Sequence, residues 1–264
     1  MRKYIETAKL YLKAQLAWRS DVFFQMLFTI TKILFAYLLW GMIFREKNTV
    51  VGFTFHGMLS YYIISSFLSQ LEMSSGISEE ITGRIRNGTF SKFVVLPLNI
   101  ESYFIAQEIG VVLFYLGFDL LAAVVWIFIF RIQFVFTMDP LLILCALLMI
   151  LIGLLFMVQL NFFLGILTLR FEEISTFLMI KNNLVSLITG TIVPLALFPE
   201  QVISCLKLLP FYYVTYLPSM LLTGRCTGEA LPGLLILTGW CIAIQFLITF
   251  TWNRYRIKYD GVGI

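Results

Sequence analysis

Ionisable side chains are scarce in this sequence. Only 13% of its 264 residues are Asp, Glu, Lys or Arg, and it contains one histidine, His56. Soluble domains carry about 25% charged residues, whereas 60% of this chain is hydrophobic. A chain of this length cannot hide so much apolar surface from water, so the composition excludes an ordinary soluble protein.

Motifs for catalysis and nucleotide binding are also missing. The sequence contains no HExxH, no GxSxG and no paired CxxC, and the dipeptide Gly-Lys, which a phosphate-binding Walker A loop requires, occurs nowhere. We therefore predict that the chain is not an enzyme, holds no metal or cofactor, and cannot hydrolyse ATP alone. His56 is interpreted as an interfacial residue at the outer edge of an apolar run.

Neither the charge balance nor the cysteines point to a further site. The formal net charge is +4, and the basic residues are scattered near the ends of apolar runs, which disfavours a nucleic-acid partner. Of the four cysteines, Cys145 and Cys241 lie inside apolar runs. Cys205 and Cys226 lack metal-like spacing, and a disulfide between them is left open.

What the sequence has instead is long apolar runs. Residues 141–169 contain no ionisable side chain, and about 20 apolar residues are enough to cross a bilayer as a helix. A window of about 19 residues predicts spans over 22–44, 53–73, 104–130, 140–168, 177–198 and 232–252. We expect a single-domain, all-α integral membrane protein (residues 1–264) with six transmembrane helices and both termini on one side.

The positive charges predict the orientation. Thirteen Lys and Arg are counted on the N-terminal side of the predicted spans, among them Lys181 near the start of the fifth span. Five fall on the opposite side, and Lys32 lies deep within the first span, which accounts for all nineteen. Short cytoplasmic loops carry the excess of Lys and Arg. Both termini are therefore expected to be cytoplasmic, in a multi-pass protein of the cytoplasmic membrane.

The first twenty residues have a different pattern. Apolar residues recur there at helical spacing, while Lys3, Lys9 and Lys13 fall elsewhere. This pattern predicts an amphipathic helix on the inner membrane surface over residues 1–20. A soluble cap helix is the alternative.

Lys32 is a charge about 15 Å deep in the first span, given a rise of about 1.5 Å per residue. Such a charge is expected to face protein or water. Gln25, Thr29 and Lys32 share one helix face, and Asp119 lies at a similar depth in the third span. We hypothesise a Lys32–Asp119 pair, which either locks two helices together or lies in a substrate path.

The fifth span carries a second polar stripe. Asn182, Ser186 and Thr189 follow the spacing i, i+4, i+7, which places them on one helix face. Such a stripe forms hydrogen bonds between helices or lines a conduit, and both interpretations place it away from lipid.

A charged segment over residues 74–103 separates the second and third spans. Ser78, followed by Glu79 and Glu80, is typical of a helix start with acidic residues in the first turn. Gly83 or the pair Asn87 and Gly88 can end it. A short helix parallel to the membrane is expected.

Three regions carry a family resemblance. Residues 80–97 resemble the cytoplasmic loop of type-2 ATP-binding-cassette (ABC) permeases in Gly88, Phe90, Phe93 and the closing Pro97. The proline-punctuated residues 199–231 look like the short outer re-entrant helices of that family. The basic tail also resembles the ending of its small six-span exporters.

The resemblance implies a mechanism and partners. Separate cytoplasmic ATPase subunits would bind ATP and Mg²⁺, and a second six-span permease, slightly more in keeping with a heterodimer, would complete the pathway within membrane lipids. The ATPase-coupling residues would be Ile77, Glu79, Glu80, Arg84 and Arg86.

Two other classes compete with this interpretation. An ion-coupled secondary transporter also places charges at mid-depth, although no inverted repeat is evident here. A membrane-embedded enzyme or an anchoring subunit is the other class. The substrate is left open.

Overall fold

The computed structural model describes residues 2–17, 19–95, 97–129, 131–171, 174–188 and 195–256, and most of these residues are helical. The longer helices are α1 (Arg2–Gln15), α2 (Arg19–Ile43), α3 (Phe55–Leu71), α4 (Ser75–Arg86), α6 (Ile100–Ile129), α7 (Pro140–Leu167), α8 (Ser175–Ile188) and α11 (Ala230–Tyr255). The short helices are α5 (Ser91–Val95), η1 (Leu195–Leu197), α9 (Glu200–Leu206), η2 (Tyr212–Tyr216), α10 (Leu217–Leu222) and η3 (Thr227–Glu229).

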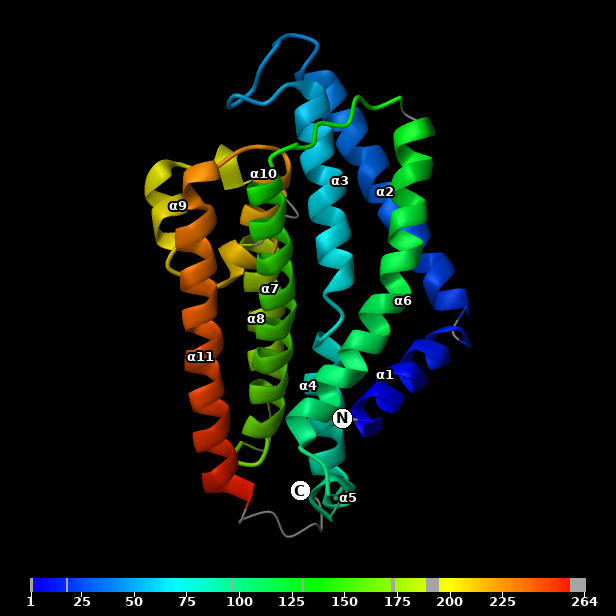
Figure 1. Cartoon of the computed structure of the whole chain (residues 1–264), viewed down its shortest axis with the longest axis vertical. Helices are drawn as coiled ribbons and strands as arrows, with labels where there is room; N and C mark the ends of the chain where they lie inside the picture. Colours follow the sequence, from blue (N-terminus) through cyan, green and yellow to red (C-terminus); the bar gives the residue numbers. More distant parts are fainter. Residues whose placement is uncertain are drawn as a thin grey trace.

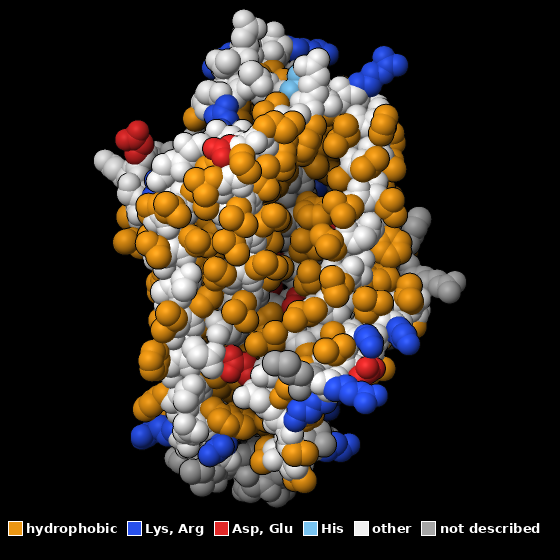
Figure 2. Space-filling view, viewed as in Figure 1, with side chains coloured by type: hydrophobic (Ala, Val, Ile, Leu, Met, Phe, Trp, Pro, Cys, Tyr) orange, Lys and Arg blue, Asp and Glu red, His pale blue; other side chains and the backbone are white. Residues whose placement is uncertain are grey.

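Six helices, α2, α3, α6, α7, α8 and α11, run along the long axis of the molecule (Figure 1). Helices α4 and α5 lie at one end, together with the last turns of α11, and α9 and α10 lie at the other. We call these the α4 end and the α10 end. Hydrophobic side chains cover the flank seen in Figure 2, and Lys and Arg lie mainly toward the two ends. This distribution matches a bundle surrounded by lipid.

Each predicted span overlaps one of the six helices. Three segments, Ile100–Ile129, Pro140–Leu167 and Thr227–Tyr255, are long and apolar enough by themselves to cross a membrane. The described part of α8 has 14 residues and α3 has 17, both shorter than the roughly 20 that a bilayer requires. The all-helical prediction is confirmed, and the count of six crossings stays a prediction.

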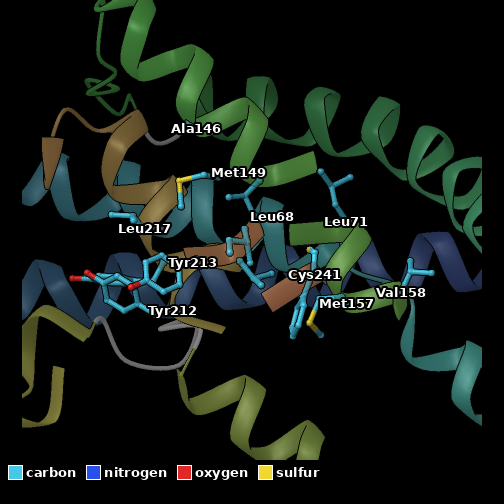
Figure 3. Packing of buried hydrophobic residues seen from close by; sticks show 14 of the residues in the cluster. Leu68, Leu71, Ala146, Met149, Met157, Val158, Tyr212, Tyr213, Leu217 and Cys241 are labelled. Carbon is cyan, nitrogen blue, oxygen red and sulfur yellow. The ribbon is translucent and has the colours of Figure 1, made fainter. Parts of the chain in front are cut away.

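Helix α7 is the centre of the packing. It contacts α11, α4, α10, η2 and α6, and its buried side chains include Met149 and Met157 (Figure 3). Around them the figure shows Tyr213 and Leu217 from the α10 end and Cys241 from α11. All of these belong to one buried hydrophobic cluster, so elements distant in sequence share a single core.

Helix α1 packs obliquely against α6. A Cβ atom added at Gly110 of α6 would lie 2.2 Å from the Ala8 carbonyl oxygen, so this approach requires glycine. The Tyr11 and Tyr103 hydroxyls lie 3.0 Å apart, and Tyr4 accepts a hydrogen bond from the Asn99 backbone N–H at 3.1 Å. The amphipathic segment is therefore bound to the bundle along one side.

The proline-punctuated segment folds into short helices at the α10 end. Lys207 pairs with Glu229 at 2.6 Å, and the Tyr212 hydroxyl donates to the same carboxylate at 3.0 Å. These contacts join α9, η2 and η3. The thiols of Cys205 and Cys226 are free, so no disulfide links them.

The start of α4 corrects one prediction. The helix begins at Ser75, not Ser78, and its first turn contains no acidic residue. The reason is that Glu72 accepts hydrogen bonds from the backbone N–H and the hydroxyl of Ser74. These bonds hold Ser74 in place, and α4 begins at the next residue. Asn87 then caps the C-terminal end, followed by Gly88 at φ +69°, as the sequence led us to expect.

Contact between α4 and α7 depends on Gly165. A Cβ atom there would lie 2.8 Å from the Cβ atom of Ile81, whereas one at Gly239 of α11 would meet no atom within 4 Å. We predict that Gly165→Leu displaces α4 and lowers the free energy of unfolding in detergent by about 1–3 kcal/mol. Gly239→Leu is the matched control and is expected to change it little. Equal effects of the two substitutions would contradict the packing described here.

Candidate functional site

Helix α4 is amphipathic and lies on the bundle through an isoleucine face. Ile77, Ile81 and Ile85 are at most 1% exposed and follow the spacing i, i+4, i+8. Glu79 and Arg86 are exposed on other sides of the helix. Burial of three isoleucines stabilises this position by several kcal/mol at about 2 kcal/mol each, which leaves the polar face available to solvent.

Glu80 and Arg84 brace α4 from the side. Arg84 pairs with Glu80 at 2.9 Å, and Gln107 of α6 donates to the other carboxylate oxygen at 3.3 Å. The Arg84 guanidinium also lies 4.9 Å from the ring centre of Phe93 in α5. These two predicted coupling residues therefore make contacts within the chain.

A buried hydrogen-bond network joins the start of α4 to α7 and α8. Lys181 of α8 donates to the Asn161 side-chain oxygen at 2.9 Å, and the Asn161 amide donates to the Ser74 hydroxyl at 2.7 Å. Ser74 in turn donates to Glu72 at the end of α3. We call these four residues the Lys181 network. It links the junction between α3 and α4 to α7 and α8 through side chains that are largely withdrawn from water.

A second carboxylate holds the same junction from the α6 side. Glu108 is 5% exposed and accepts a hydrogen bond from the Met73 backbone N–H at 3.1 Å. Two of the three residues between α3 and α4 are therefore tied to neighbouring helices, Met73 to α6 and Ser74 to α7. Movement of α4 must displace these contacts or carry the neighbouring helices with it.

A cleft of about 180 Å³ lies beside the Lys181 network. Two residues of the predicted polar stripe, Asn182 and Ser186, line it together with Lys181 and Thr215. Thr189 lies outside the described residues. The structure thus places part of the stripe in a polar recess next to the buried ammonium group.

Lys32 and Asp119 lie in different environments and do not form the predicted pair. The Lys32 side chain is exposed, whereas Asp119 is 5% exposed and lines a small cavity with Ile33 and Ala122. No ion pair joins the two charges among the residues that the structure describes. The reason is that Ile33, one position further along α2, faces Asp119. Gln25 and Thr29 have side chains outside the described set.

His56 lies at the start of α3, where its Nδ1 atom accepts a hydrogen bond from the Gln133 backbone N–H at 3.3 Å. Within the described part of the chain, no cluster of His, Cys, Asp and Glu has the geometry of a metal site. His56 therefore contacts the loop between α6 and α7 through Gln133.

The Lys181 network was not predicted from the sequence. Lys181 was counted with the charges at the ends of the spans, although the structure buries it inside α8. Glu72, Glu108 and Asn161 were not selected at all. The available signal was Gln159 and Asn161, which are polar residues within the longest apolar run.

A family model described as ABC-2 family transporter protein matches residues 30–263. The chain belongs to the ABC-2 transporter family. This confirms the resemblance noted above, and the matched region contains α4, the Lys181 network and the cleft beside it. A search of curated proteins found no match to the chain.

Family membership defines the general role of the molecule. It is a multi-pass membrane permease of an ABC transporter, which is a transport subunit and not itself an enzyme. Permeases of this family work with cytoplasmic ATPase subunits.

The permease depends on Asn161 to satisfy Lys181. We predict that Asn161→Leu lowers the free energy of unfolding in detergent by about 3–5 kcal/mol, because a buried ammonium group loses its partner. Lys181→Met in the same background is expected to recover part of this loss. Asn182→Leu, a neighbouring exposed position, is the control and should change stability by less than about 0.5 kcal/mol. Additive effects of the Asn161 and Lys181 substitutions would contradict direct coupling.

Proposed function

We propose that this permease forms one half of the translocation pathway of an ATP-driven exporter, with α4 as the helix that docks into a separate ATPase subunit. The observation that carries the proposal is the amphipathic character of α4. Its isoleucine face is buried in the bundle, and its opposite face is polar and exposed at the α4 end. Because the sequence lacks a Walker A loop, ATP and Mg²⁺ would be bound by the partner.

The docking face comprises Gly76, Glu79 and Arg86, which are exposed. Ile77, which the resemblance assigned to coupling, is 1% exposed and contributes by holding α4 on the bundle. Glu80 and Arg84 stiffen the helix between these two faces. The charged contact with the ATPase would therefore be made mainly by Glu79 and Arg86.

The Lys181 network would carry motion from α4 into the bundle. Closure of the ATPase subunits on ATP would displace α4, and the contacts from Ser74 to Asn161 and Lys181 would pull α7 and α8 with it. The cleft lined by Asn182 and Ser186 lies directly on this route. Substrate would meet this polar recess on the way across the membrane.

The second half of the pathway would be another six-span permease. Helix α8 exposes a row of large apolar side chains, including Phe177, Ile180, Leu184 and Leu187. Such a face is covered either by lipid or by a partner helix. A heterodimer is slightly favoured by the family resemblance, and mass analysis of the purified complex distinguishes it from a homodimer.

Asp119 supports a second candidate function, that of an ion-coupled transporter. Its Oδ2 atom is buried and has no hydrogen-bond partner in the described structure. Buried carboxylates within a membrane bundle carry protons in secondary transporters. Transport that continues without any ATPase and stops when the proton gradient is collapsed would favour this alternative.

Reversing the charge of Glu79 or of Glu80 distinguishes the proposed docking face of α4 from the residues that brace it within the chain. We predict that Glu79→Lys weakens co-purification of the ATPase subunit about tenfold or more, because it reverses the charge that α4 presents to the partner. Membrane insertion should be unchanged, and thermal stability should fall only slightly, because Glu79 is exposed and interacts with Lys181 only at long range. Glu80→Lys is expected to lower thermal stability as well, since it loses contacts with Arg84 and Gln107. If Glu79→Lys retains ATPase binding fully, α4 is not the docking helix.

Cysteine labelling tests the orientation with native residues. Cys205 is exposed at the α10 end, while burial, followed by the nearby Glu229 carboxylate, raises the pKa of the Cys226 thiol and slows its reaction with maleimide. We predict that a membrane-impermeant maleimide labels intact cells at Cys205, since the α10 end would face outward. Cys205→Ser is the control and should abolish this labelling. Labelling only after the membrane is opened would reverse the proposed orientation.

A further inference from the structure

A second cleft, of about 400 Å³, lies between the start of α6 and the end of α11. It shares no lining residue with the cleft beside α8. Phe162 of α7 also lines it, and α6 and α11 both belong to segments long enough to cross the membrane. The cleft is therefore placed where those helices reach the membrane boundary at the α4 end.

One part of the lining is apolar. Val94, Leu98 and Ile248 contribute aliphatic side chains, and Phe93 and Trp252 contribute aromatic rings. Tryptophan at the end of a membrane helix is typical of the layer where lipid headgroups meet acyl chains. A ligand held here would have a hydrocarbon part in contact with this surface.

The other part of the lining carries two opposite charges. Gln159 donates to Gln245 at 2.6 Å, and Gln245 donates to one carboxylate oxygen of Glu101 at 2.9 Å, which orients this carboxylate at the cleft. Arg256 lines the same cleft and is exposed. Across the described ranges, neither Glu101 nor Arg256 forms an ion pair, so both charges remain available to a ligand.

We propose that this cleft binds a phospholipid whose headgroup carries a phosphate and a primary ammonium group, as phosphatidylethanolamine does. The guanidinium of Arg256 matches the phosphate, and the Glu101 carboxylate accepts hydrogen bonds from the ammonium group. The volume is within the range of small-molecule sites, and the apolar lining faces the first part of the acyl chains. The proposal is independent of the transport function, because it requires only the membrane location of α6 and α11.

Native mass spectrometry of the purified permease tests it with three lipids that have the same acyl chains. We expect phosphatidylethanolamine to bind roughly tenfold more tightly than phosphatidylcholine, whose quaternary ammonium group donates no hydrogen bond. Phosphatidylglycerol, which has no cation, should also bind more weakly. Equal binding of all three lipids would overturn the proposal.

Two substitutions assign the selectivity to this cleft. Glu101→Gln keeps an acceptor for Gln245 but removes the charge, so it should bring phosphatidylethanolamine down to the level of phosphatidylcholine. Arg256→Gln should weaken every phospholipid, whereas Arg254→Gln, an exposed arginine outside the lining, should have no effect. Thermal unfolding of each variant without added lipid verifies that the fold is retained. Unchanged selectivity in Glu101→Gln, or equal losses in the two arginine variants, would contradict the assignment.

Discussion

The ammonium group of Lys181 is a charge inside a bundle whose outer surface is apolar, and the structure near α4 is organised around satisfying it. Water is scarce in such a setting, so an unpaired charge there is costly. Asn161 accepts from Lys181 and donates to Ser74, and Ser74 donates to Glu72. This requirement fixes three helices relative to one another at the level where α4 begins.

The contacts that satisfy Lys181 also explain how α4 could pass motion into the bundle, as we propose. A short helix held only by its isoleucine face could slide on the bundle, since hydrophobic contacts are not directional. The directional hydrogen bonds at Ser74 and the contact of Glu108 with Met73 prevent this. In the proposed mechanism, a push on the exposed face of α4 would therefore be passed to α7 and α8. The proposed lipid cleft, between α6 and α11, contains none of the four residues of the Lys181 network.

Much of the fold was predictable from local sequence, because apolar runs and amphipathic spacing are properties of single segments. The positions of the six long helices, of α1 and of α4 follow from such patterns. The contacts of the site were harder to predict from the sequence. Partners such as Lys181 and Asn161 come from different helices, and the rotation of each helix decides which side chains meet. Lys32 is an example: its depth in α2 was predicted to match that of Asp119, but the rotation of the helix places the next residue, Ile33, against Asp119 instead. The family resemblance predicted that residues 74–103 couple to an ATPase, which stays a prediction, and it gave no sign of the network that holds α4.

If the Lys181 network transmits motion as we propose, α4 and α8 move as one unit. Electron paramagnetic resonance distances test it in the complex with ATPase subunits, using spin labels on cysteines introduced at Asn87, Leu184 and Gly239 after the native cysteines are replaced. Asn87 is the exposed residue that caps the C-terminal end of α4, Leu184 is exposed in α8, and Gly239 faces open space in α11. The account predicts that ATP binding leaves the α4–α8 distance unchanged and alters the α8–α11 distance. An α4–α8 distance that changes on ATP binding while α8–α11 stays fixed would contradict it.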